Sequence, residues 1–256
     1  MNDSDTITSR DNAKLKLART VRDGRERSLI FAEGRRLLDE VLRSRLTIEH
    51  VLISSDVADA VKPDLLPANV VRVASRLFDS IADTANSQGI IALARKPESD
   101  LSSIPEGLVV LLHRINNPSN LGAVVRTAEA SGAAGLITTS GSADAFSPKA
   151  LRASMGSAFR VPIVEAMGFE EAIAWAKGRG SVTTAADVSG TIRYTQVDWT
   201  TPRLVVFGSE AHGLDEGELA AIDEKILIPM ENEVESLNLA VSSGIILFEA
   251  KRQRIG

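Results

Sequence analysis

Two kinds of apolar pattern alternate along the first part of this chain. Short runs rich in β-branched and aliphatic residues predict strands at 48–54, 70–74 and 89–95. A helix is predicted at 75–85, between the second and third strands, and the stretch 10–45 is predicted to be helical in two runs. This alternation indicates a small α/β domain.

A change of composition follows these elements. The segment that separates the two halves reads KPESDLSSIPEG, with two prolines, three serines and few apolar residues. Such a composition is typical of an interdomain linker. The predicted organisation is therefore a first domain at 1–96, a linker at 97–107 and a second domain at 108–256.

The second half alternates again, with strands that are apolar almost throughout. Strands are predicted at 108–115, 135–139, 161–165, 181–187, 203–210 and 225–230. Helices are predicted at 119–131, 148–156, 169–180, 216–223 and over the long last segment, 238–254. Continuous apolar strands separated by helices indicate a parallel sheet covered on both faces, so the predicted fold class is α/β.

Composition narrows the class of protein. Apolar residues make up 44% of the chain and aromatic residues only 4%, which predicts an aliphatic core. The chain has no cysteine, which excludes disulfides, thiolate metal sites and cysteine nucleophiles and fits a reducing compartment. The start is polar, and the longest apolar runs, such as LVVLL, are too short to cross a bilayer. We expect a cytoplasmic protein without a membrane partner.

Charge is distributed unevenly. The net charge of −5 argues against a nucleic-acid partner. Between residues 10 and 36, however, nine basic residues face four acidic ones, and a local basic patch matters more for phosphate contact than the total. The alternative is a solvated helix face with salt bridges.

The loop after the strand at 108–115 is unusually polar. In a parallel sheet, ligands bind where strands end and loops lead into helices. Here Asn116, Asn117 and Asn120 crowd the turn, and Ser119 or Asn120 can cap the next helix. Arg126 lies off the apolar stripe of that helix, which by itself favours a solvent-facing arginine.

Two further segments carry polar or flexible residues at similar places. Gly208 and Gly213 bracket a turn after the strand at 203–210, and Glu210 within it reads alone as a loop acid or helix cap. Ser236 and Asn238 precede the last helix and read alone as N-cap residues.

Several enzyme classes lack their signatures. Leu214 follows the glycine pair where a phosphate-binding loop needs Lys-Ser/Thr, and no strand leads into G-x-G-x-x-G, so a nucleotide-dependent oxidoreductase is disfavoured. There is no G-x-S-x-G elbow. The three histidines show no ligand spacing, and no metal site is expected.

Three segments, taken together, resemble a known family. The stretches NPSNLGAVVRTAEASG, GSEAHGL and IPMENEVESLNLAVSSGIILFEAKRQR are similar, in order and spacing, to the three motifs of the SpoU (TrmH-like) RNA 2′-O-ribose methyltransferases of the SPOUT superfamily. ITSRDNAKLK and FAEGRRLLDEVL resemble parts of that family's substrate-binding domain, and FSPKALRASMGSAFRVPI resembles a further shared segment. The resemblance covers nearly the whole chain.

The resemblance implies a fold and an activity. The expected fold is a parallel-sheet SPOUT methyltransferase domain with a C-terminal trefoil knot, preceded by a small α/β ribosomal-protein-like substrate-binding domain. The implied activity is S-adenosylmethionine-dependent methylation of a ribose 2′-hydroxyl, with 23S ribosomal RNA as the expected substrate, by a homodimer whose sites lie near the subunit interface. The alternatives are a transfer-RNA methyltransferase and a non-catalytic RNA-binding assembly factor.

The resemblance also assigns roles to residues. Arg126 is expected to approach the 2′-hydroxyl, and the residues expected to position it, the ribose and the cofactor are Asn120, Glu210, Ser236 and Asn238. The expected cofactor pocket comprises Gly208, Gly213, Ile228, Met230 and Leu237. The expected RNA contacts are Arg152, Ser154, Arg10 and Lys14. Two departures are His212, where the family varies, and the acidic stretch MENEVES, which is unusual near RNA.

Overall fold

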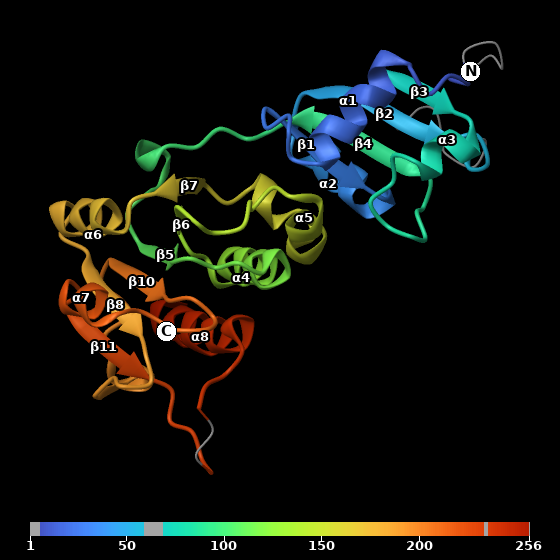
Figure 1. The fold of residues 1–256 in the computed structure, drawn as a ribbon. Helices are drawn as coiled ribbons and strands as arrows, with labels where there is room; N and C mark the ends of the chain where they lie inside the picture. Colours follow the sequence, from blue (N-terminus) through green and yellow to red (C-terminus); the bar gives the residue numbers. More distant parts are fainter. Residues whose placement is uncertain (1–5, 59–68, 233–234, 256) are drawn as a thin grey trace. The chain divides into compact units, whose positions relative to one another are not determined.

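The computed structural model describes residues 6–58, 69–232 and 235–255 (Figure 1). The polar start of the chain at 1–5 and Glu233 and Val234 of the acidic stretch lie outside the described residues.

The chain divides into two compact units. The first comprises Met1–Glu98 together with Phe146–Phe159, and the second comprises Ser99–Ala145 together with Arg160–Gly256. One segment from the middle of the sequence is thus grouped with the N-terminal residues.

The first unit is built on a four-stranded sheet in the order β1-β4-β2-β3. Its strands are β1 (Leu29–Glu33), β2 (Ile48–Ser54), β3 (Val70–Val73) and β4 (Ile90–Arg95). β4 is antiparallel to both β1 and β2, and β2 is parallel to β3. The helices of this unit are α1 (Ala13–Arg22), α2 (Arg35–Arg43), α3 (Ser75–Asp79) and α5 (Pro148–Ser154). Leu15, Ala18 and Val21 of α1 are buried in a core that also contains residues of the sheet. Helices packed on a sheet confirm the predicted small α/β domain.

Two predictions for this unit were wrong in detail. The stretch 10–45 is not helical throughout, because it contains strand β1. All five residues of β1 are buried, so the strand has no alternation of polar and apolar positions to distinguish it from a buried helix. The helix predicted at 75–85 ends at Asp79, and the backbone N–H groups of Asp83 and Thr84 donate to the buried carboxylate of Glu33 instead.

The second unit is built on a seven-stranded sheet in the order β7-β6-β5-β10-β8-β11-β9. Its strands are β5 (Leu108–Leu112), β6 (Gly135–Thr139), β7 (Ile163–Met167), β8 (Val182–Ala186), β9 (Ile192–Arg193), β10 (Arg203–Phe207) and β11 (Glu224–Leu227). Every neighbouring pair in this sheet is parallel, as predicted. The short strand β9 was not predicted.

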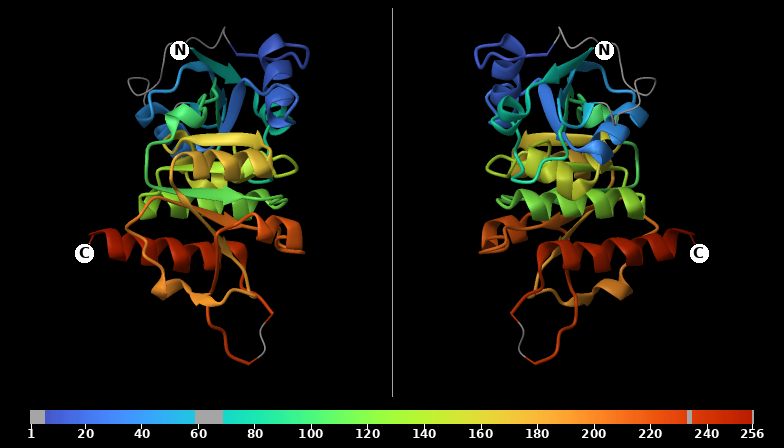
Figure 2. Two further views of the ribbon diagram at one scale, coloured as in Figure 1. Left: turned by 90° about the vertical axis from the view of Figure 1, so that its left-hand side faces the viewer. Right: turned by 90° about the vertical axis from the view of Figure 1, so that its right-hand side faces the viewer.

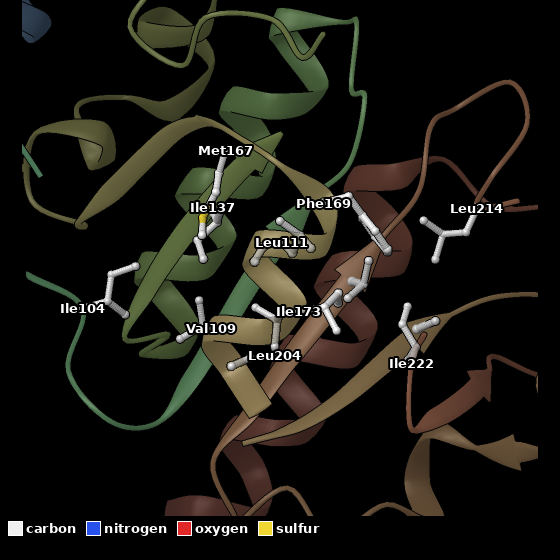
Figure 3. Packing of buried hydrophobic residues seen from close by; sticks show 14 residues of the cluster. Ile104, Val109, Leu111, Ile137, Met167, Phe169, Ile173, Leu204, Leu214 and Ile222 are labelled. Carbon is white, nitrogen blue, oxygen red and sulfur yellow. The ribbon is translucent and has the colours of Figure 1, made fainter. Parts of the chain in front are cut away.

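Helices cover both faces of this sheet. They are α4 (Pro118–Ser131), α6 (Phe169–Gly178), α7 (Glu216–Ala220) and α8 (Leu239–Ile255). α4 and α8 run side by side (Figure 2). Figure 3 shows α6 across the other face, where Phe169 and Ile173 pack on Leu111 of β5 and Leu204 of β10. The predicted helices of this half are present, with ends shifted by a few residues.

The arrangement brings one pair of strands from distant parts of the sequence together. β5 lies beside β10, pairing Leu108 with Arg203 and Leu112 with Phe207. From β5 the chain adds β6 and β7 on one side, whereas β8, β11 and β9 lie on the other side of β10. The boundary between β5 and β10 is therefore a switch point, where an open α/β sheet binds ligands. None of the helices formed by the described residues has the length and apolar character needed to span a membrane.

Candidate cofactor and active site

The loops that follow β5 and β10 meet at this switch point. The loop after β5 contains Asn116 and leads into α4, and the loop after β10 contains Glu210. Because the two strands are parallel neighbours, their carboxyl ends lie at the same edge of the sheet. The start of α8 supplies the third polar segment, through Asn238.

Glu210 connects the two strand-end loops. Its Oε1 accepts a hydrogen bond from Asn120 Nδ2 at 2.9 Å, and its Oε2 accepts one from the backbone N–H of Asn116 at 3.3 Å. Asn238 Nδ2 lies 3.5 Å from Asn120 Oδ1, a long contact. Three of the residues predicted to act together, Asn120, Glu210 and Asn238, are therefore in one hydrogen-bonded group.

The N-cap of α4 differs from the prediction, whereas that of α8 agrees with it. The N-cap of α4 is Asn117, whose side chain accepts from Ser119 N at 2.9 Å, and not Ser119 or Asn120. Asn120 lies within the first turn and its side chain is free to reach Glu210. Asn238 accepts from Ala240 N at 2.9 Å, so it caps α8 and contacts Asn120 as well.

The turn between Gly208 and Gly213 is closed tightly on itself. Ser209 and Gly213 exchange backbone hydrogen bonds of 3.1 and 2.9 Å. A Cβ atom on Gly208 would lie 2.4 Å from the carbonyl carbon of Gly213, and Gly213 has a φ of +65°. A side chain is excluded at Gly208 by lack of space and is disfavoured at Gly213 by the backbone conformation.

A cavity of about 120 Å³ lies next to the start of α8. It is lined by Ala186, Asp187, Val188, Ile226, Ile228, Met230, Ser236, Leu237, Ser242 and Ile246. Four of the residues predicted for the site, Ile228, Met230, Ser236 and Leu237, are among them. Gly208 and Gly213 are not among the lining residues, although a Cβ on Gly213 would lie 3.7 Å from the Asp187 carboxylate.

Asp187 is the residue that the sequence analysis missed. It follows β8 directly and is the one carboxylate among the described residues that line the cavity. Its Oδ1 accepts from the backbone and hydroxyl of Ser189, at 2.8 and 2.6 Å. Its position after a buried strand was the available signal, because strand ends in a parallel sheet face the ligand.

Arg126 lies outside this hydrogen-bonded group. It is exposed on α4, while Leu121, Val124, Val125 and Ala128 of the same helix are buried as predicted. Among the residues that the structure describes, the Arg126 side chain forms no hydrogen bond or ion pair with another. A single chain therefore leaves this guanidinium available to a substrate or a partner.

The residues predicted to contact RNA all belong to the first unit. Arg10 is exposed and Lys14 is half-buried. Arg152 forms an ion pair with Asp83 at 2.6 Å. Ser154 is fully buried and its hydroxyl donates to the carbonyl of Leu151, so the prediction that it faces RNA is not supported by its position.

The fold and the cavity define an α/β protein that binds a small molecule at the carboxyl edge of a parallel sheet. Comparison with known proteins identifies the family within this class. Residues 107–248 match the model of the SpoU rRNA methylase family, and residues 12–92 match that of the MRM3-like substrate-binding domain.

Two relatives each cover nearly the whole chain. An uncharacterized tRNA/rRNA methyltransferase of Synechocystis is 30% identical over 97% of this chain and 94% of its own length. The 23S rRNA (guanosine(2553)-2′-O)-methyltransferase RlmP of Bacillus subtilis is 26% identical over 96% of this chain and 98% of its own.

A solved structure shows the same arrangement. The SpoU methyltransferase AviRb from Streptomyces viridochromogenes, in complex with the cofactor AdoMet, matches 96% of this chain and 99% of its own at 28% identity, with a TM-score of 0.86. The chain belongs to the SpoU rRNA methylase family, whose members are S-adenosylmethionine-dependent RNA methyltransferases. The resemblance inferred from the three motifs is confirmed.

Proposed function

We propose that this protein transfers the methyl group of S-adenosylmethionine to a ribose 2′-hydroxyl of 23S ribosomal RNA. The observation that carries the proposal is the placement of the Asn120–Glu210–Asn238 group and the cavity at the start of one helix, α8. Family membership and the 23S rRNA enzymes among the relatives support it.

The residues of the cavity fit the cofactor. Ile228, Met230 and Leu237 offer apolar walls to an adenine ring, and a cavity of about 120 Å³ is smaller than a whole-ligand pocket, so it suits that ring more than the entire molecule. Asp187 offers a carboxylate to the hydroxyl or ammonium groups of the cofactor. The turn at Gly208 allows close approach of backbone donors and acceptors.

When bound, S-adenosylmethionine supplies an electrophilic methyl group on its sulfonium. The chain must bring the 2′-hydroxyl to that group and assist loss of its proton. Asn120 and Asn238 offer hydrogen-bonding groups beside Glu210, which contacts both strand-end loops. We assign to Arg126 the orientation of the hydroxyl and neutralisation of a nearby phosphate, since a guanidinium stays protonated at working pH.

The experiment that tests this function is a methyl-transfer assay. Purified protein is incubated with isotopically labelled S-adenosylmethionine and either 23S rRNA or transfer RNA, and the RNA is digested to nucleosides for mass spectrometry. We expect one 2′-O-methylated nucleoside from the ribosomal RNA. Label in transfer RNA alone would favour the tRNA alternative, and no label in either RNA would favour the non-catalytic assembly factor.

We further propose that the first unit binds RNA, with Arg10, Lys14 and Arg152 as contacts. The family model of a substrate-binding domain over 12–92 supports this role. The predicted division into 1–96, linker and 108–256 is kept as a proposal, as is the trefoil knot of the C-terminal segment. A ribosomal RNA substrate also favours a cytoplasmic location.

Neutralising two basic residues of the first unit should weaken RNA binding in a salt-dependent way. For the double variant Arg10→Ala/Lys14→Ala, we expect the slope of log K against log salt to fall by about 1 to 2, because each phosphate contact releases counterions. Lys225→Ala, an exposed lysine of the second unit, is the control and should leave the slope unchanged. An unchanged slope in the double variant would show that these side chains only face solvent. Filter binding at several salt concentrations measures the effect.

The homodimer is proposed from an exposed apolar stripe on α8. Val241, Phe248 and Ile255 are 51%, 48% and 74% exposed and seven residues apart, so they lie along one side of the helix. A helix that buries its opposite side on α4 and leaves such residues in solvent is suited to a second copy of the chain. This interface would lie near the site, as the family resemblance implies.

Introducing charge into the apolar stripe should separate the subunits. For Phe248→Glu we expect a monomer at micromolar concentration, because burying an unpaired carboxylate in an interface has a large unfavourable free energy. We also expect loss of most methyl transfer. Light scattering after size-exclusion chromatography measures the mass. Ala220→Glu, an exposed small residue on α7, is the matched control and should behave as the parent protein does. A Phe248→Glu protein with the parent's mass would remove this stripe from the interface.

A further inference from the structure

A buried polar group lies at the carboxyl end of β5, in the second unit. His113, the residue after the last residue of β5, is 2% exposed. Its Nδ1 lies 3.0 Å from the hydroxyl of Thr139, and its Nε2 lies 2.8 Å from Oε1 of Glu218, which is 8% exposed. Burial of three polar side chains is costly unless each donor among them faces an acceptor, so the positions of their protons matter.

The hydrogen bonds around His113 select one tautomer. The backbone N–H of Arg114 donates to Thr139 Oγ1 at 3.1 Å, so the Thr139 hydroxyl proton is available to donate to Nδ1. The remaining ring proton is then on Nε2 and faces Glu218. The Glu218 oxygen is close but off the line of the Nε2–H bond, so this contact acts as a charge–dipole attraction more than as an aligned hydrogen bond.

Each end of this group is attached to one of the site loops. Arg114, with a φ of 52°, opens the loop that continues to Asn116, whose N–H donates to Glu210. At the other end, Glu218 Oε2 accepts from the backbone N–H of Asp215 at 2.9 Å, and Asp215 caps α7 directly after the Gly208–Gly213 turn. His113 therefore joins the bases of the two loops whose tips meet at Glu210.

We propose that His113 is a positioning residue for methyl transfer, which as the neutral Nε2–H tautomer holds the loop after β5 and the turn after β10 in register through Thr139 and Glu218. This role rests on the proposed function. A second proton, on Nδ1, would force the Thr139 hydroxyl to accept from both His113 and Arg114 N, and its own hydrogen would have to find another acceptor in a buried site. Protonation of His113 is therefore expected to loosen both loops.

The charged groups around the ring have opposing effects on its pKa. Burial is the largest influence and lowers the pKa of His113 below 6.5, Glu218 and Asp215 raise it, and Arg114 lowers it. Thr139 from β6 is uncharged, and the ring of Phe169 from α6 packs against the imidazole edge at 4.8 Å between centroids. His113 is thus neutral at neutral pH, in the state that the hydrogen bonds require.

The first test compares two variants of the hydroxyl partner. Thr139→Val removes the donor to Nδ1 and the acceptor of Arg114 N. We expect kcat to fall by about tenfold, because both buried groups lose their hydrogen-bond partner and the loop after β5 is held less firmly. The Kd for S-adenosylmethionine should change far less, because Thr139 supports the loop after β5 through Arg114 N, whereas the Glu218–Asp215 hydrogen bond beside the turn after β10 stays intact. Thr139→Ser keeps the hydroxyl and should recover most of the lost kcat. Equal kcat for Thr139→Val and the parent protein would overturn the proposal.

The second test uses charge changes of opposite sign. Glu218→Gln keeps an oxygen for Asp215 N but removes the negative charge, so the pKa of His113 falls and the acid limb of kcat should move to lower pH. Arg114→Gln should move it to higher pH. The chain has only three histidines, so ¹⁵N-histidine spectra, assigned with His113→Asn, follow the tautomer and titration directly. Variants that lower kcat without moving the acid limb would show that His113 is only structural.

The same spectra separate this proposal from the proposed function. If no RNA is methylated, the backbone amide signal of His212, which lies within the 208–213 turn and carries the same label, still reports whether the turn responds to the titration of His113. A turn that stays unchanged as His113 titrates would reject the positioning role whatever the reaction is.

Discussion

Replacing Arg126 with alanine is expected to abolish methyl transfer while leaving cofactor affinity intact. The side chain is exposed on α4 and forms no hydrogen bond or ion pair with another described residue, so its removal should not disturb the fold. Loss of a cationic group that orients the hydroxyl and offsets phosphate charge should lower kcat by roughly 10²–10³-fold, as loss of a preorganised donor does elsewhere. Methyl incorporation into RNA gives kcat, and calorimetry gives the Kd for S-adenosylmethionine.

Two further variants serve as controls for Arg126→Ala. Arg126→Lys keeps the charge but loses the planar fork of donors, so partial activity is expected. Arg193→Ala removes an exposed arginine elsewhere in the second unit and should be silent. If Arg126→Ala turned over RNA as fast as the parent protein, Arg126 would be the solvent-facing arginine that helical periodicity alone suggests.

Gly208→Ala is expected to weaken cofactor binding strongly. The added Cβ would lie 2.4 Å from Gly213 C and 2.7 Å from Leu214 N, and both of these are backbone atoms that cannot rotate away. The turn must open, and overpacking of this kind costs about 1–3 kcal/mol, which corresponds to a roughly 5- to 150-fold higher Kd for S-adenosylmethionine. Calorimetric titration measures it directly.

The control for this variant is a glycine at which an added Cβ meets no other atom. Gly178 at the end of α6 has nothing within 4 Å of an added Cβ and does not have a positive φ, so Gly178→Ala should leave the Kd unchanged. A Gly208→Ala protein that binds the cofactor as tightly as the parent does would show that the turn is not part of the binding site. Circular dichroism of both variants separates a local opening of the turn from loss of the fold.

The fold of the second unit was predictable because its pattern is simple. The strand LVVLL is apolar throughout and RLVVF is apolar after its first residue, and helices separate such strands, which is how a parallel sheet with two covered faces appears in a sequence. In the first unit β1 escaped prediction because its five residues are all buried and lie between two helices. Strand order could not be read from the pattern at all, since periodicity carries no information on which strands become neighbours.

The candidate site was predictable only in part, for a similar reason. The resemblance assigned Asn120 and Glu210 from motifs, and the structure places them 2.9 Å apart. Asp187 follows a strand with no motif around it, and its relation to the cavity depends on the position of β8 beside β10 and β11. His113 was considered only as a metal ligand, because its partners Thr139 and Glu218 are distant in sequence and ordinary in type.

The neighbouring positions of β5 and β10 have a consequence for biosynthesis. β5 emerges from the ribosome long before its partner, and the cavity wall is completed only by residues of β11 and α8 near the end of the chain. Pairing of strands so far apart is slow, and the N-terminal part of a growing chain folds first. A nascent polypeptide halted anywhere before α8 should therefore hold no S-adenosylmethionine, because its cavity still lacks the wall formed by Ser242 and Ile246.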